Sequence, residues 1–145
     1  MGNDDALAER LRESIGRLVR VTRAHADSLP PPHSALLGLL GREGDMTIAA
    51  LAQRRGVRHQ SASRTVMELL AAGHVGRHPD PGDRRALLVA LTDAGREALD
   101  RDRRARRDGM ARAIARALTP DERARLATVP DLLDKLAAHT ADEQE

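Results

Sequence analysis

A short segment in the middle of the chain constrains the fold more than any other. Residues 79–85 read Pro-Asp-Pro-Gly-Asp-Arg-Arg, a run dominated by residues that favour turns. The flanking stretches, residues 75–78 and 86–91, have the composition of two short β-strands. The sequence therefore predicts a β-hairpin with two arginines at its tip, to which the rest of the chain must connect.

Helices are predicted on the N-terminal side of this hairpin. Apolar residues recur at helical spacing from about residue 5 to residue 27, and charged residues fill the opposite face. The prolines at positions 30–32 should end this helix, because proline disfavours helical geometry in the residue before it. A second helix is expected from about residue 32 to residue 40, with Gly41 and Gly44 as its stop signals.

The next two expected helices form a helix-turn-helix. The first begins after Thr47, whose hydroxyl can cap the N-terminus, and ends at Gly56. The second covers roughly residues 58–72 and stops at Gly73. Two short helices joined by a glycine-containing turn are typical of this motif, and a basic hairpin directly after them is a wing. The expected fold is mainly α with a small β-hairpin, a winged helix-turn-helix.

Helical patterns continue after the hairpin. A long helix from about residue 93 to residue 118 begins at a Thr92-Asp93 cap, and Thr119, Pro120 and Glu122 have the pattern of a capping box that starts the last helix. Pro130 should kink or split this last helix. The terminal apolar stripes exceed what one small winged domain can bury. We therefore expect a homodimer with residues 1–31 and 93–145 as its dimerisation helices and residues 32–92 as its DNA-binding domain.

Composition excludes several function classes. The chain has no cysteine, so disulfides, thiolate metal sites and thiol redox sensing are ruled out. It has no Phe, Tyr or Trp, so any small-molecule pocket must be aliphatic. No long apolar run suggests a membrane span, and the acidic N-terminus does not resemble a signal peptide, which favours a cytoplasmic protein. No Ser-His-Asp context or glycine-rich phosphate loop is present, so we predict neither an enzyme nor a cofactor.

Positive charge gathers in the middle third of the chain. The formal net charge is only +2, yet between Arg54 and Arg85 seven arginines stand against three acidic residues. The planar guanidinium suits phosphates and base edges, so this segment has the electrostatic footprint of a protein that binds double-stranded DNA. The later run at residues 101–107 interleaves arginines with an acid, and we interpret it as a solvated helix face.

The segment from Met46 to Gly95 resembles the MarR family of bacterial transcription regulators. The resemblance rests on MTIAALAQRRGV at residues 46–57 and LLAAGHVGRHPDPGDRRALLVALTDAG at residues 69–95, above all on DPGDRR followed by a strand and Leu91-Thr92-x-x-Gly95. The flanking helices match in number and order, so the resemblance extends over nearly the whole chain. It implies an obligate dimer with interlocked terminal helices, each subunit placing its recognition helix in a major groove and its wing in the neighbouring minor groove.

Candidate DNA-reading residues lie on the recognition helix and on the wing. Glutamine can read adenine and arginine can read guanine by paired hydrogen bonds, although a merely solvated polar face is the alternative. The resemblance implies that Arg85 enters the minor groove, that Asp83 holds the tip and that Arg84 meets phosphate. The helix opens with Arg58 where the family commonly has a capping serine, so either Ser61 caps a later start or Arg58 gives up the cap for a DNA contact. The full set is Arg58, His59, Gln60, Ser61, Ser63, Arg64, Arg77, Asp83, Arg84 and Arg85.

The expected function is a dimeric repressor of a pseudo-palindromic operator, released when a small molecule binds between the dimer helices and the winged domain. Without aromatic side chains the pocket favours aliphatic or anionic ligands, with Arg17, Arg20, His25 and His33 as possible anchors. A second hypothesis is a metal-sensing regulator that uses the histidines, although no matched ligand cluster accompanies them and no metal site is predicted. A third is a protein-interaction module without DNA binding, against which the arginine-rich surface argues.

Overall fold

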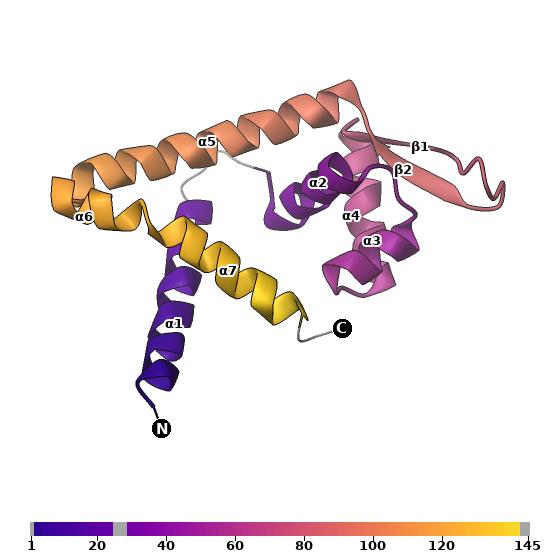
Figure 1. Ribbon diagram of the computed structural model, residues 1–145. Coiled ribbons are helices and arrows are strands. Elements are labelled where there is room, and N and C mark those ends of the chain that lie inside the picture. The colour runs from indigo at the N-terminus through magenta and orange to yellow at the C-terminus, as the bar shows by residue number, and fades with distance from the viewer. Residues whose placement is uncertain (1, 25–28, 143–145) are drawn as a thin grey trace. The chain divides into compact units, whose positions relative to one another are not determined.

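The computed structural model describes residues 2–24 and 29–142 (Figure 1). The fold is mainly α with one antiparallel hairpin, which confirms the predicted fold class. The helices and strands are α1 (Asn3–Ala24), α2 (Pro31–Glu43), α3 (Ile48–Arg55), α4 (His59–Ala71), β1 (Val75–Pro79), β2 (Leu87–Leu91), α5 (Asp93–Ala117), α6 (Pro120–Leu126) and α7 (Val129–Asp142). The chain divides into two compact units, Met1–Arg107 and Asp108–Glu145. Across the described residues, no helix combines the length and hydropathy needed to cross a membrane.

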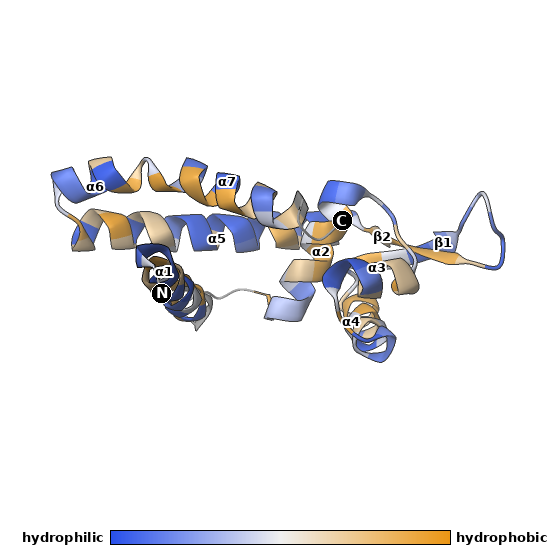
Figure 2. Ribbon diagram, turned by 60° about the horizontal axis from the view of Figure 1, so that its bottom comes forward, coloured by the Kyte–Doolittle hydropathy of each residue, from blue (hydrophilic) through white to orange (hydrophobic). Residues whose placement is uncertain are grey.

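The core of the first unit is built from aliphatic side chains only. Leu36 and Leu37 of α2 pack with residues of α3, α4 and the hairpin, and the helix-turn-helix pair α3 and α4 lies side by side. Full burial of one such side chain contributes roughly 1.5–3 kcal/mol, so this small cluster holds the helix-turn-helix and the hairpin together. Its fully buried members are Leu36, Leu37, Leu51, Val66, Leu69 and Val89. Figure 2 shows hydrophobic residues on α2 and β2, which contribute to this core, and hydrophilic residues at the hairpin tip.

The caps at both ends of α3 follow from local sequence. Thr47 accepts a hydrogen bond from the backbone N–H of Ala50 at 3.1 Å, as an N-cap should. Gly56 closes α3 in the left-handed conformation, with φ of 63°, where a β-carbon would be strained. Both predicted ends are therefore confirmed.

The predicted end of α2 near residue 40 was too early, whereas the expected stop at Gly44 is confirmed. Gly41 does not stop the helix, which continues to Glu43 and ends at Gly44, whose φ is 88°. A β-carbon at Gly41 would lie 3.3 Å from the Leu99 side chain on α5, so this glycine serves close packing of α2 against α5. From the sequence alone, a glycine required for close packing cannot be distinguished from a glycine that ends a helix.

The C-terminal unit has the predicted breaks. Thr119 and Glu122 form the complete capping box at the start of α6, and α7 begins at Val129 with Pro130 in its first turn, so the expected split is confirmed. Among its described residues, 108–141, none is buried. The Leu132 and Leu136 side chains of α7 remain 55% and 54% exposed.

Candidate nucleic-acid interface

Helix α4 presents its N-terminal polar face to solvent because its opposite face is anchored in the core. Ala62, Val66 and Leu69 are completely buried, which fixes the rotation of the helix about its own axis. All members of the predicted set on this helix are exposed except Ser63, which is partly exposed. The exposed members are Arg58, His59, Gln60, Ser61 and Arg64.

The start of α4 excludes one of the two alternatives left by the sequence, a later start capped by Ser61. Arg58 is the N-cap residue, and no side chain hydrogen-bonds to the first-turn N–H groups. Ser61 lies inside the first turn, and its carbonyl oxygen accepts the Thr65 hydroxyl at 3.1 Å. The helix therefore starts at an exposed arginine, with first-turn amides open to an anion such as a DNA phosphate.

The wing is a regular β-hairpin whose tip is held by hydrogen bonds within the turn. Strands β1 and β2 pair antiparallel from Val75 opposite Leu91 to Pro79 opposite Leu87. At the tip, the Asp80 carboxylate accepts the Gly82 N–H at 2.9 Å and the Asp83 carboxylate accepts the Arg85 N–H at 3.0 Å. Each carboxylate thus closes the turn that follows it.

The wing carries three exposed arginines. The Asp83 carboxylate accepts the backbone N–H of Arg85, and none of the ion pairs among the described residues includes the guanidinium groups of Arg84 and Arg85. Arg84 and Arg85 are both exposed, as is Arg77 on β1. The tip therefore offers positive charge on a turn held by hydrogen bonds.

The base of the wing contains contacts that the sequence analysis missed. Met46, just before α3, forms a β-bridge with Val89, with N–O distances of 3.2 and 2.7 Å. Next to it, His78 Nε2 lies 2.7 Å from the Asp45 carboxylate. This hydrogen bond, with a further contribution from the Pro79 carbonyl, raises the pKa of His78 above its usual range. The separation of 33 residues between His78 and Asp45 left no local signal of the pair.

The predicted effector anchors that the structure describes do not line one common pocket. Arg17 and Arg20 are exposed on α1 and line a shallow groove made by that helix alone. His33 lies at the start of α2, where its ring is 2.6 Å from the Glu68 carboxylate of α4. His25 lies outside the described residues. Within the described ranges, no group of three or more potential ligands could hold a metal ion.

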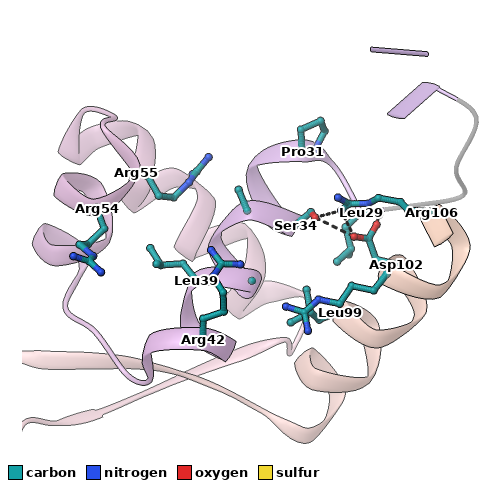
Figure 3. Close-up of a pocket in the computed structure, with 13 residues that line it drawn as sticks. Leu29, Pro31, Ser34, Leu39, Arg42, Arg54, Arg55, Leu99, Asp102 and Arg106 are labelled. Carbon is teal, nitrogen blue, oxygen red and sulfur yellow. Dashed lines mark hydrogen bonds and ion pairs between the residues drawn. The ribbon is translucent and has the colours of Figure 1, made fainter. Parts of the chain in front are cut away.

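The interpretation of residues 101–107 as a solvated face is wrong for one member. Asp102 is 3% exposed, and its carboxylate accepts hydrogen bonds from the Leu29 N–H at 3.1 Å and the Ser34 hydroxyl at 3.0 Å. Arg106, one turn later, pairs with the same carboxylate and donates to the Ser34 hydroxyl (Figure 3). The sequence signal for this buried group was the single acidic residue among the arginines, because a carboxylate is buried only when it is paired and hydrogen-bonded.

A helix-turn-helix anchored in the core, a helix start with an exposed arginine and a basic hairpin define a winged helix-turn-helix DNA-binding protein. A model of the MarR family matches residues 27–86. An HTH-type transcriptional regulator of Mycobacterium tuberculosis is 38% identical over 96 residues, which cover 65% of this chain and 67% of that relative. A similar regulator of Mycobacterium leprae is 36% identical over the same shares. The chain belongs to the MarR family of DNA-binding transcriptional regulators.

Solved structures agree with this assignment. A putative transcriptional regulator from Pseudomonas aeruginosa superposes with a TM-score of 0.83 at 31% identity, covering 95% of this chain and 99% of that one. MarR from E. coli, without ligand, superposes with a TM-score of 0.71 at 22% identity, covering 94% and 98%. At that lower identity the second match supports the fold alone.

Proposed function

We propose that this MarR-family regulator acts as a homodimeric repressor that a small molecule releases from a pseudo-palindromic operator. The observation that carries the dimer is apolar surface at both ends of the chain. Leu7, Leu18 and Val21 of α1 are 61%, 51% and 52% exposed, and α7 exposes its leucines in the same way. A face of this kind on a helix needs a partner, and a second copy supplies matching faces.

The dimer sets the geometry of DNA binding. With residues 1–31 and 93–145 as dimerisation helices, two copies of the winged domain, residues 32–92, are related by a two-fold axis. Helix α4 then enters the major groove with Gln60 and Arg64 toward base edges and Arg58 toward phosphate. The wing reaches the adjacent minor groove through Arg85, with Arg84 on phosphate. His59, Ser61, Ser63 and Arg77 complete the proposed contacts.

Effector action follows from this arrangement. A molecule that binds one spacing of the two α4 helices better than the other shifts the population toward that spacing. If the favoured spacing does not match the operator half-sites, the dimer leaves the DNA. The effector therefore has to contact groups whose relative position depends on that spacing.

The test combines assembly and DNA binding. Genomic fragments retained by the purified protein are sequenced, and a fluorescent duplex with the recovered motif is titrated by anisotropy over a salt series. We expect a dimer by analytical ultracentrifugation, half-sites about 34–36 Å apart or a multiple of this, and affinity that falls steeply with salt. A monomer at micromolar concentration, or retention of fragments with no common motif, contradicts the proposal.

A further inference from the structure

The outward face of α4 changes from polar to apolar along the helix. The completely buried residues Ala62, Val66 and Leu69 mark the inward face. With about 3.6 residues per turn, a stripe of residues three or four positions apart runs along the opposite face. The members of this outward stripe are Gln60, Arg64, Met67 and Ala71, and all of them are exposed. The N-terminal half of the outward stripe is therefore polar, whereas its C-terminal half is apolar.

Met67 is the larger of the two apolar residues on this stripe and is 52% exposed. Among the described residues, the buried core cluster and the side chains packed against it do not include Met67, so core packing does not explain this residue. Isolated apolar residues are common on protein surfaces. Met67, however, lies one turn beyond Arg64 and two turns beyond Gln60. Its apolar surface is thus continuous with the face that we propose reads base edges.

An apolar side chain has one preferred partner in the major groove of DNA. Thymine displays a 5-methyl group there, whereas the other three bases display only hydrogen-bond donors and acceptors. The methionine thioether is a weak acceptor and not a donor, so a cytosine amino group or a purine N7 beneath it loses water without gaining a good partner. The flexible side chain of methionine can adapt its rotamer to a methyl group. Position 67 therefore favours thymine and disfavours the other bases.

The spacing along α4 gives the position of that thymine. The seven-residue step from Gln60 to Met67 corresponds to about 10.5 Å along the helix axis. Base pairs rise about 3.4 Å each, so this distance equals about three base-pair steps when the helix follows the groove. We infer that Met67 determines specificity by contacting the 5-methyl group of a thymine about three base pairs from the base that Gln60 reads. The inference rests on the proposed placement of α4 in the major groove.

The test removes the methyl group alone from the operator. Each thymine of the recovered operator motif is replaced in turn by deoxyuridine, which pairs with adenine but lacks the 5-methyl group. The replacement is made in both half-sites, and the affinity of the full-length protein is measured by fluorescence anisotropy at constant salt. At one thymine per half-site we expect wild-type affinity to fall about fifteenfold, since one methyl group removed from water corresponds to about fourfold in each half-site.

Variants at position 67 identify the residue that contacts the methyl group. Met67→Ala should bind the thymine operator more weakly than the wild type and should not discriminate between thymine and deoxyuridine at that position. Met67→Leu retains a large apolar side chain and should retain the discrimination. Leu87→Ala is the matched control, because Leu87 is 48% exposed in the same compact unit but lies on β2. This control should discriminate as the wild type does, and thermal melting checks that each variant is folded.

The outcomes separate this inference from the proposed function. Equal affinity of the wild type for every thymine and deoxyuridine operator overturns the inference, whereas sequence-specific binding of the same operator leaves the proposed function intact. A loss at one thymine that persists in Met67→Ala also overturns the inference, because another residue or the shape of the duplex then carries the effect. Retention of genomic fragments with no common motif refutes the proposed function and, with it, the inference.

Discussion

Gly95 on α5 lies directly against the backbone of His74, so closely that a β-carbon at Gly95 would be 1.8 Å from the His74 carbonyl oxygen. The same carbonyl accepts the Thr92 N–H at 3.2 Å, and the Thr92 hydroxyl donates to the Gly73 carbonyl at 2.6 Å while accepting the Gly95 N–H at 3.0 Å. Thr92 and Gly95 therefore join the start of α5 to the end of α4. This contact explains why the Leu-Thr-x-x-Gly pattern has a threonine and, three residues later, a glycine.

Gly95→Ala should destabilise the winged domain, because the added methyl group must displace backbone rather than a flexible side chain. We expect a loss in the free energy of unfolding of about 1–3 kcal/mol, the range for overpacking a tight contact, measured by urea denaturation. Gly109→Ala on the same helix is the control, because its β-carbon would meet only an Arg112 side chain at 4.0 Å. Equal stability of the two variants would contradict the close contact.

Asp102→Ala should loosen the start of α2 from α5. It removes the acceptor shared by the Leu29 N–H and the Ser34 hydroxyl, and a buried group left without a partner costs about 1–3 kcal/mol. Unfolding by urea measures the loss, with Asp100→Ala at an exposed position of α5 as the control. If Asp102→Ala were as stable as Asp100→Ala, the buried carboxylate would make no net contribution to the free energy of unfolding.

The His78–Asp45 pair should make stability depend on pH. Since folding raises the pKa of His78, the stabilisation is complete below its unfolded pKa of about 6.5 and is lost as pH rises through the higher folded value. Asp45→Asn should lower the pKa of His78 in an NMR titration and lower the melting temperature at acidic pH more than at alkaline pH. In a His78→Gln background, Asp45→Asn should lose this pH-dependent effect; if the effect persists, another group is responsible.

The two wing arginines should differ in what they recognise. Arg85→Ala should weaken operator binding by about 1–3 kcal/mol, most on A·T-rich flanks, where a narrow minor groove attracts guanidinium. Arg84→Ala, if it meets only phosphate, should weaken all sequences alike and reduce the salt slope by about 0.9 per contact. Gln60→Ala or Arg64→Ala should instead relax preference at particular base pairs. Wild-type affinity of Arg85→Ala on every duplex would refute the role of the wing.

Removal of residues 1–28 should give monomeric or aggregated protein, because the partner of the remaining apolar faces is lost. Leu18→Asp is the sharper variant, since this side chain is 51% exposed in the single chain and its replacement leaves the winged core untouched. Sedimentation should show a monomer for Leu18→Asp and a dimer for the exposed neighbour Arg17→Ala. A truncated chain that stays dimeric and binds DNA would refute dimerisation through α1.

Local chemistry determined much of this protein from sequence. Thr47, Gly56 and the Thr119 box each act on backbone groups within a few residues, so their helix ends could be predicted without knowledge of the rest. The wing tip is equally local, because Asp80 and Asp83 bond backbone amides two residues later. The order of helices and strands, and with it the fold class, followed from these signals.

The tertiary structure alone decided which residues meet across long stretches of chain. Three contacts depend on how the helices pack. They are the close approach of Gly41 to Leu99, the hydrogen bond of Asp102 to Ser34 68 residues away, and the hydrogen bond between His78 and Asp45. A periodic pattern specifies the buried face of a helix but not the neighbour that covers it. For this reason the sequence predicted the exposed polar face of α4, whereas the hydrogen bonds that join α5 to the start of α2 emerged only when those helices were in place.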